Sequence, residues 1–160
     1  MRPYMDKVLP QAWEAAQEYS AAVAEQTKEQ GLSGEDVELI RVRASQLNGC
    51  AFCLDLHSRE ARSVGVPQQK LDLLPAWRES SLYSERERAL LAVVEAATRL
   101  PLNEESAADL EGARAELGEE AYVAAEWVSA TINLFNRISI LSEHPVRPRG
   151  ADGRILREQS

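Results

Sequence analysis

Two cysteines three residues apart, Cys50 and Cys53, and a histidine four residues further on, His57, are the residues of this chain best suited to chemistry. The chain has no other cysteine. On an α-helix, side chains three or four residues apart share a face, with Cβ atoms roughly 5–6 Å apart. A small adjustment brings two such cysteines to the Cβ separation of a disulfide, about 3.5–4.5 Å. The pair can therefore cycle between dithiol and disulfide without refolding the chain.

The predicted start of a helix at these cysteines favours the thiolate form. Asn48 and Gly49 interrupt the hydrophobic pattern and can cap a helix that begins around Cys50, which puts both thiols in its first turn. Free backbone N–H groups and the helix dipole stabilise an anion there. His57 can take the proton of Cys53, whereas Cys50 lies seven residues away, about 10 Å along the axis. We therefore predict that Cys53 reacts first and that Cys50 resolves the product.

A Cys-x-x-Cys pair has other uses in proteins. Free cysteines often pack as inert hydrophobic residues, but a paired spacing at a helix start favours reactivity. A zinc site would need Cys50, Cys53, His57 and His144 within about 2.0–2.3 Å of one ion. Because Cys50 and His57 are two turns apart on one helix, zinc binding is the less favoured alternative. A thioredoxin-like site needs a βαβ pattern, which this sequence lacks.

Length and charge narrow the class of protein. A chain of 160 residues fits one domain with a single core, and its net charge of −8 argues against a nucleic-acid or anionic-membrane partner. The sequence has no apolar run of roughly 18 residues and no signal peptide at the N-terminus. We therefore expect a cytoplasmic protein, in a compartment that keeps thiols reduced. No motif indicates a metal, haem or flavin cofactor.

Apolar residues recur at helical spacing almost throughout, and the period-2 alternation of strands is absent, so the predicted fold is all-α, a bundle of about six to seven helices. Capping boxes at Ser33 and Ser84 mark two helix starts. A helical domain is predicted over residues 1–143 and an extended charged tail over 144–160. The helices are expected at about 9–30, 33–48, 50–64, 68–74, 84–100, 103–117 and 119–141, with a loop through Pro75 and Trp77.

Glu38 is the candidate proton-transfer carboxylate. It shares a helix face with Val42 and Ser45, and that face leads to the turn at Cys50. Its alternative interpretation is an exposed glutamate in an early helical turn. Glu95 is expected on a helix flank. The polar residues that interrupt the last helix, Asn133, Asn136 and Arg137, are expected to form hydrogen bonds in the core or at an interface.

The pattern Glu38, eleven residues, Cys50-x-x-Cys53-x-x-x-His57 resembles the core motif of the AhpD-like alkylhydroperoxidases, in the carboxymuconolactone decarboxylase superfamily. The resemblance covers roughly residues 30–142, including the segments 43–50, 76–79, 83–90 and 132–138. It implies an all-helical fold that forms trimers or hexamers, and a peroxidase with Cys50 and Cys53 as redox pair. It also implies that His57 and Glu38 relay protons. Some relatives have a second histidine just before the second cysteine, where this chain has Phe52.

The expected function is therefore a thiol-dependent peroxidase that reduces alkyl hydroperoxides through a sulfenate and disulfide cycle. The resemblance implies an external dithiol reductant of the lipoyl or thioredoxin type. The segment 119–141 has apolar residues on more than one face, which also favours a homo-oligomer. The main alternative is a non-enzymatic redox sensor or interaction module that uses the same dithiol.

Overall fold

The computed structural model describes residues 2–156. Within these residues there is no β-strand, and an isolated bridge joins Arg149 to Ile155. The all-α prediction is confirmed. The α-helices are α1 (Met5–Val8), α2 (Pro10–Glu29), α3 (Gly34–Asn48), α4 (Ala51–Ser63), α5 (Gln68–Leu73), α6 (Glu85–Thr98), α7 (Glu104–Leu117) and α8 (Glu119–Leu141), and a 3₁₀ helix, η1 (Leu74–Glu79), follows α5.

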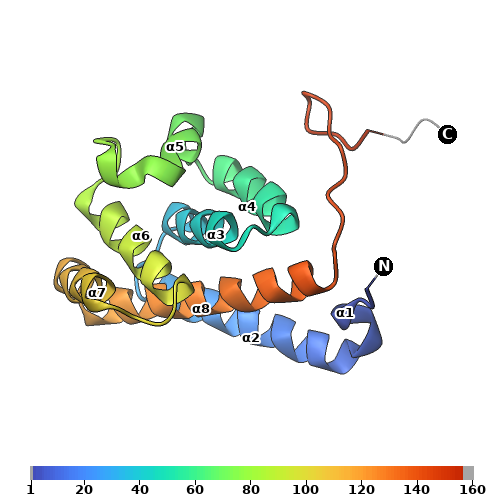
Figure 1. The fold of residues 1–160 in the computed structure, drawn as a ribbon, viewed down its shortest axis with the longest axis horizontal. Helices are drawn as coiled ribbons and strands as arrows, with labels where there is room; N and C mark the ends of the chain where they lie inside the picture. The colour runs from blue at the N-terminus through green and yellow to red at the C-terminus, as the bar shows by residue number, and fades with distance from the viewer. Residues whose placement is uncertain (1, 157–160) are drawn as a thin grey trace.

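Helix α3 lies at the centre of the bundle. It packs against α4, α6 and α8, and α7 packs against α6. The long helices α2 and α8 run side by side, and the N-terminal helix α1 lies at one end of this pair (Figure 1). The segment after α8 leaves the bundle and runs past α4 (Figure 1). The dithiol turn, which joins α3 to α4, is therefore attached to a helix that packs against three others.

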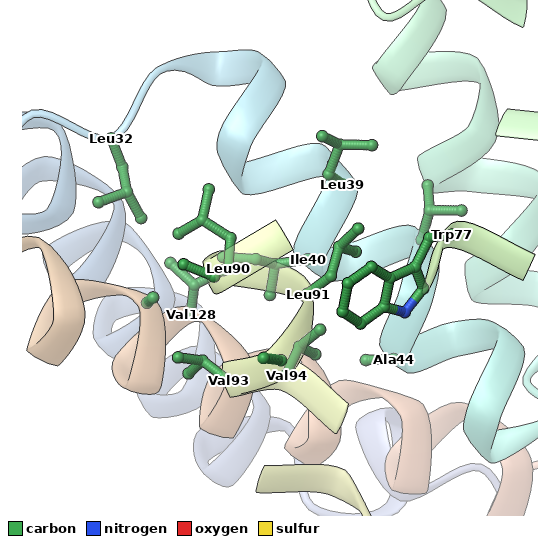
Figure 2. Packing of buried hydrophobic residues seen from close by; sticks show 14 of the residues in the cluster. Leu32, Leu39, Ile40, Ala44, Trp77, Leu90, Leu91, Val93, Val94 and Val128 are labelled. Carbon is green, nitrogen blue, oxygen red and sulfur yellow. The ribbon is translucent and has the colours of Figure 1, made fainter. Parts of the chain in front are cut away.

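One hydrophobic core joins the helices (Figure 2). Its centre is made of branched aliphatic side chains from α3, α6 and α8 that pack around the indole of Trp77 from η1. Each fully buried side chain of this size contributes roughly 1.5–3 kcal/mol through its removal from water. The residues that form this centre include Leu39, Ile40, Leu90, Leu91, Val93, Val94 and Val128.

The capping boxes predicted at Ser33 and Ser84 are both formed. Each serine hydroxyl accepts a hydrogen bond from the backbone N–H three residues on, and the acid at that position accepts one from the serine N–H. A third box, between Asn103 and Ser106, starts α7. These local contacts explain why the predicted helix starts agree closely with the observed ones.

The predicted loop through Pro75 and Trp77 was wrong. These residues form η1, with Pro75 in its first turn. Burial of Trp77 and a 2.9 Å hydrogen bond from its Nε1 to Glu95 Oε1 hold this turn against the core. The short helix α1 was also not predicted, because it has only four residues and none of them is buried.

The described part of the predicted tail, residues 144–156, contains no helix. The last four residues of the predicted tail, 157–160, lie outside the described part of the chain. Searching residues 2–156 for a helix with the length and apolarity of a bilayer span yields no candidate.

Candidate functional site

The turn between α3 and α4 carries the two cysteines. Gly49 ends α3 with a φ of 66°, in the left-handed region that glycine adopts without steric strain. Cys50 is then the N-cap of α4, and its Sγ accepts a hydrogen bond from the backbone N–H of Cys53 at 3.3 Å. Asn48 and Gly49 were expected as caps of this helix, but the structure assigns them to the end of α3. The sulfur of Cys50 itself caps α4.

The two cysteines are joined as a disulfide, with their Cα atoms 5.4 Å apart. This separation lies inside the usual range of about 4.4–6.8 Å. Both residues are buried. Because a cross-link stabilises mainly through the loop that it closes, a bridge between residues three apart on one helix does little to hold the fold together. The bond is therefore suited to opening and closing.

A buried glutamate orients the histidine of the motif. His57 Nδ1 lies 3.0 Å from Glu38 Oε2 and 3.1 Å from Glu60 Oε2. The other oxygen of Glu38 accepts a hydrogen bond of 2.7 Å from Arg41 Nη1. With Nδ1 donating its proton to a carboxylate, the free nitrogen of a neutral imidazole is Nε2, which can then act as a base. The carboxylates also stabilise the imidazolium that forms when Nε2 takes a proton.

A cavity of about 840 Å³ opens onto this pair of groups. Cys53 and His57 both line it, whereas Cys50 is not among the lining residues. Arg41, which binds Glu38, also contributes to the wall. Two of the four predicted site residues, Cys53 and His57, therefore line the cavity. The other two are bonded to them: Glu38 to His57 and Cys50 to Cys53.

The two ends of the chain contribute to the cavity, which the sequence did not indicate. His144, after α8, packs edge to face against Phe52 with ring centroids 5.4 Å apart. Its Nε2 lies 3.3 Å from Asp6 Oδ1. Burial raises the pKa of Asp6, but hydrogen bonds from His144 and Lys7 outweigh it and lower that pKa overall. The second histidine of this chain therefore lies against the phenylalanine that replaces the additional histidine of some relatives.

Asparagines of α8 hold the end of α3 that leads into the cysteine turn. The side-chain amide of Asn48 donates hydrogen bonds to Asn133 Oδ1 at 3.0 Å and to Asn136 Oδ1 at 2.9 Å. Asn136 in turn donates to Ser45 Oγ at 3.1 Å. The prediction that these asparagines form core hydrogen bonds is confirmed. These hydrogen bonds fix α8 to the end of α3, from which the cysteine turn begins.

Glu95 was expected on a helix flank, and that expectation was wrong. The residue is buried between α3, η1 and α6. Its Oε1 accepts hydrogen bonds from Arg43 Nη2 at 2.6 Å and from Trp77 Nε1 at 2.9 Å, and its Oε2 accepts one from Arg78 at 3.1 Å. Burial raises its pKa, but the hydrogen bonds from Trp77 and Arg43 together lower it. It does not line the dithiol cavity.

Within residues 2–156, three donors lie close enough to share a metal ion: Glu38, His57 and Glu60, whose ligand atoms are within 4.8 Å of one another. The hydrogen bond between Glu38 and His57 and the short distance between Glu60 and the same ring nitrogen already account for this proximity. Neither cysteine belongs to the group. The chemistry that this arrangement supports is proton transfer beside a disulfide.

The sequence profile of the carboxymuconolactone decarboxylase family matches residues 10–96. The uncharacterised protein YdfG of Bacillus subtilis is 39% identical over 114 residues, which cover 71% of this chain and 78% of YdfG. The uncharacterised protein YnjA of Escherichia coli is 35% identical over 63 residues, covering 39% of this chain and 35% of YnjA.

Two solved structures share the fold. ATU0492 of Agrobacterium tumefaciens, a protein of unknown function described as a candidate antioxidant defence protein AhpD, has a TM-score of 0.77 and 35% identity. The match covers 91% of this chain and 98% of that protein. A variant of the debrominase Bmp8 in complex with 2,3,4-tribromopyrrole has a TM-score of 0.70 and 22% identity over 84% of this chain and 70% of Bmp8. The second match bears on the fold alone.

Proposed function

Because the chain belongs to the carboxymuconolactone decarboxylase family and has the AhpD-like fold, we propose that it is a thiol-dependent peroxidase that reduces alkyl hydroperoxides. The single observation that carries this proposal is the placement of Cys53 and His57 on one cavity wall, with the buried Glu38 bound to His57 Nδ1. A family named for a decarboxylase supports a catalytic role for this cavity.

In the first step, His57 Nε2 takes the thiol proton of Cys53, and the thiolate attacks the terminal oxygen of the hydroperoxide. The O–O bond breaks, Cys53 becomes a sulfenic acid, and the leaving alkoxide takes a proton to become the alcohol. Glu38 supports this step because it keeps the Nδ1 proton in place and stabilises the imidazolium. Cys53 is favoured for attack because it lines the cavity and Cys50 does not.

In the second step, the thiolate of Cys50 attacks the sulfenic sulfur of Cys53, which releases water and forms the disulfide. One thiolate of an external dithiol then attacks Cys53 from the cavity, and Cys50 leaves as a thiolate. The second thiolate of the reductant attacks its own mixed-disulfide sulfur, which releases Cys53 and leaves the reductant as a disulfide. The hydrogen bond from the Cys53 N–H to Cys50 Sγ, at the N-terminus of α4, stabilises that leaving thiolate. A lipoyl-type or thioredoxin-type dithiol would supply the two electrons.

Serine variants of the two cysteines test the order of these steps. Cys50→Ser should react once with peroxide and accumulate a sulfenic acid at Cys53, which dimedone labels and mass spectrometry locates. Cys53→Ser should give no label, because the remaining thiol does not line the cavity. A label on Cys50 in Cys53→Ser, together with none on Cys53 in Cys50→Ser, would reverse the assignment.

Steady-state turnover separates an enzyme from a redox sensor. With peroxide and an excess of dithiol, the peroxidase consumes many equivalents of peroxide per chain, whereas a sensor is oxidised once. Cys50→Ser/Cys53→Ser is the matched control for background reaction between peroxide and dithiol. Consumption by the unmodified chain that does not exceed this control would refute the proposal, and metal analysis of the purified protein would then test the zinc alternative.

We also propose that the chain forms a homo-oligomer, with the family resemblance favouring three or six copies. Support comes from the outer face of α8, where Val123, Trp127 and Leu134 are exposed, Trp127 to 51%. Apolar side chains of this size on one helix are typical of a surface that pairs with another chain. Light scattering at micromolar protein concentration tests this proposal. A measured mass equal to that of the monomer would contradict it.

A further inference from the structure

We propose that the dithiol cavity binds an amphipathic organic acid, with the carboxylate at a cluster of arginines and the apolar chain along an aromatic wall. The identification of this acid as the hydroperoxide substrate rests on the proposed function, whereas its binding does not. The arginine cluster is defined here as Arg59 of α4 with Arg147 and Arg149 of the C-terminal segment. All three line the cavity.

The size and the walls of the cavity indicate an organic ligand. Its volume of about 840 Å³ is in the range of pockets that enclose molecules of drug size and far exceeds what hydrogen peroxide needs. Trp13 and Phe135 form an edge-to-face pair in its wall, with ring centroids 5.7 Å apart. Leu56 and Ile132 add further apolar surface to the lining. An alkyl chain can therefore lie in the cavity with its surface removed from water.

The side chains that line the cavity have a surplus of positive charge, whereas the whole chain has a negative net charge. The net charge of the chain is −8. The cavity is nevertheless lined by five cationic side chains and three acidic ones: Lys7, Arg41, Arg59, Arg147 and Arg149 against Asp6, Asp55 and Glu60. Lys7 pairs with Asp6, and Arg41 pairs with Glu38 behind the wall. The surplus of positive charge is therefore concentrated at the arginine cluster.

In this cluster, the carboxylate of Asp55 forms ion pairs with two guanidinium groups. Arg59 Nη2 lies 3.1 Å and Arg149 Nε lies 3.6 Å from the same oxygen, Asp55 Oδ2. The Nε atoms of both arginines are buried and have no hydrogen-bond acceptor within residues 2–156. Buried donors of this kind are normally satisfied, and a guanidinium matches a carboxylate with two parallel N–H groups. Two unsatisfied donors at one place point to an anionic ligand group.

Arg147 adds a third positive charge beside this pair. It is exposed and makes no ion pair with the described residues, so it can turn towards a ligand. Arg147 and Arg149 lie outside residues 10–96, the part that the family profile matches. The C-terminal segment, which runs past α4 in Figure 1, therefore supplies two of the three arginines from outside the part that the profile matches.

Binding of three probes that share a ten-carbon chain to the full-length protein tests this inference directly. Isothermal calorimetry should give an affinity for decanoate at least ten-fold higher than for decanol or for decyltrimethylammonium, which differ from it mainly in the charge of the headgroup. Arg147→Ala/Arg149→Ala should lose this ten-fold preference. Arg62→Ala/Arg154→Ala removes the same charge from exposed positions outside the cavity and should retain it.

Turnover assays separate this inference from the proposed function. The hydroperoxide of an unsaturated fatty acid should have a KM at least ten-fold lower than that of its methyl ester in the unmodified chain, and the two values should converge in Arg147→Ala/Arg149→Ala. Equal KM values for the acid and the ester in the unmodified chain, or equal affinity for decanoate and decanol, would overturn the inference. The proposed peroxidase function would be unaffected by either result. Selective binding of decanoate without peroxide turnover would refute the peroxidase and leave the acid site intact.

Discussion

Glu38 and Glu95 are two buried glutamates of the same chain, each 5% exposed and each bound by an arginine from α3. In Glu95, Oε1 accepts hydrogen bonds from the buried side chains of Arg43 and Trp77, and Oε2 accepts one from Arg78, which is partly exposed. In Glu38, one oxygen binds Arg41, and the other binds a histidine at the wall of a cavity. The carboxylate of Glu95 is therefore bound by hydrogen-bond donors alone, whereas the carboxylate of Glu38 is bound to an imidazole that can accept a proton.

This difference shows what separates a structural carboxylate from a candidate catalytic one. Both are buried, and both have a cationic partner within hydrogen-bond distance, so burial and charge alone do not separate them. What separates them is the second partner. The imidazole of His57 has a second ring nitrogen that can accept a proton, whereas the indole of Trp77 and the guanidinium of Arg43 only donate hydrogen bonds. Substitutions of the two glutamates should therefore affect different properties of the protein.

The largest effect is expected for Glu95→Ala, on stability. The change leaves the guanidinium of Arg43, whose side chain is 8% exposed, without its carboxylate. Removing one partner of a buried ion pair typically lowers the free energy of unfolding by about 3–5 kcal/mol. Urea denaturation at neutral pH measures this loss. A loss below about 1 kcal/mol would contradict the assignment of Glu95 as the carboxylate that joins α3, η1 and α6.

Glu38→Gln should instead lower the rate of the first chemical step, by about 10- to 100-fold, because the amide keeps a hydrogen-bond acceptor for Nδ1 but does not stabilise the imidazolium. Its effect on stability should be smaller than that of Glu95→Ala, since Arg41 is partly exposed and water can solvate its charge. Stopped-flow measurement of sulfenic acid formation in the Cys50→Ser background gives the rate. An unchanged rate would remove Glu38 from the mechanism.

Features that depend on local sequence were predicted well. The bounds of α3, α6 and α8 follow from capping boxes and apolar spacing within one helix, and the structure confirms them. The pairing of Glu38 with His57 depends on how α4 folds back on α3, so spacing alone did not establish it. The family resemblance indicated both residues, because the family motif contains the glutamate and the histidine that the turn at Gly49 brings together.

Features that depend on contacts between distant segments were missed. Glu95 is held by Arg43, 52 residues away, and its own neighbours in the sequence give no sign of that partner. The indole of Trp77 binds the same carboxylate, which is why a segment with a loop-like sequence forms η1. His144 reaches the cavity from the tail, because it packs on Phe52 and bonds to Asp6. None of these contacts has a periodic signal in the sequence.

The pH dependence of stability also tests the role of Glu95 as a structural carboxylate. The pKa of Glu95 is lowered in the folded chain, so its ionised form contributes stability in full above the unfolded value of about 4.3. That contribution is lost as the pH falls from there through the lowered folded pKa. The free energy of unfolding should therefore fall more steeply below pH of about 4 in the unmodified chain than in Glu95→Gln. Parallel curves for the two proteins would contradict this prediction.

The smallest effect is expected for Arg99→Ala, which also removes a cation beside Glu95. Arg99 Nη1 lies 3.6 Å from Glu95 Oε2, but its side chain is 59% exposed, against 8% for Arg43. Exposed ion pairs four residues apart on a helix contribute about 0.3–0.5 kcal/mol, because water screens the charges and ordering the side chain opposes the gain. Urea denaturation of Arg99→Ala should therefore show a loss within about 0.5 kcal/mol, and Arg43→Ala, measured beside it, a loss several times larger. A loss above about 1 kcal/mol for Arg99→Ala would mean that the stabilising network around Glu95 extends to the surface, and the contrast with Glu38 would then rest on the chemistry of His57 alone.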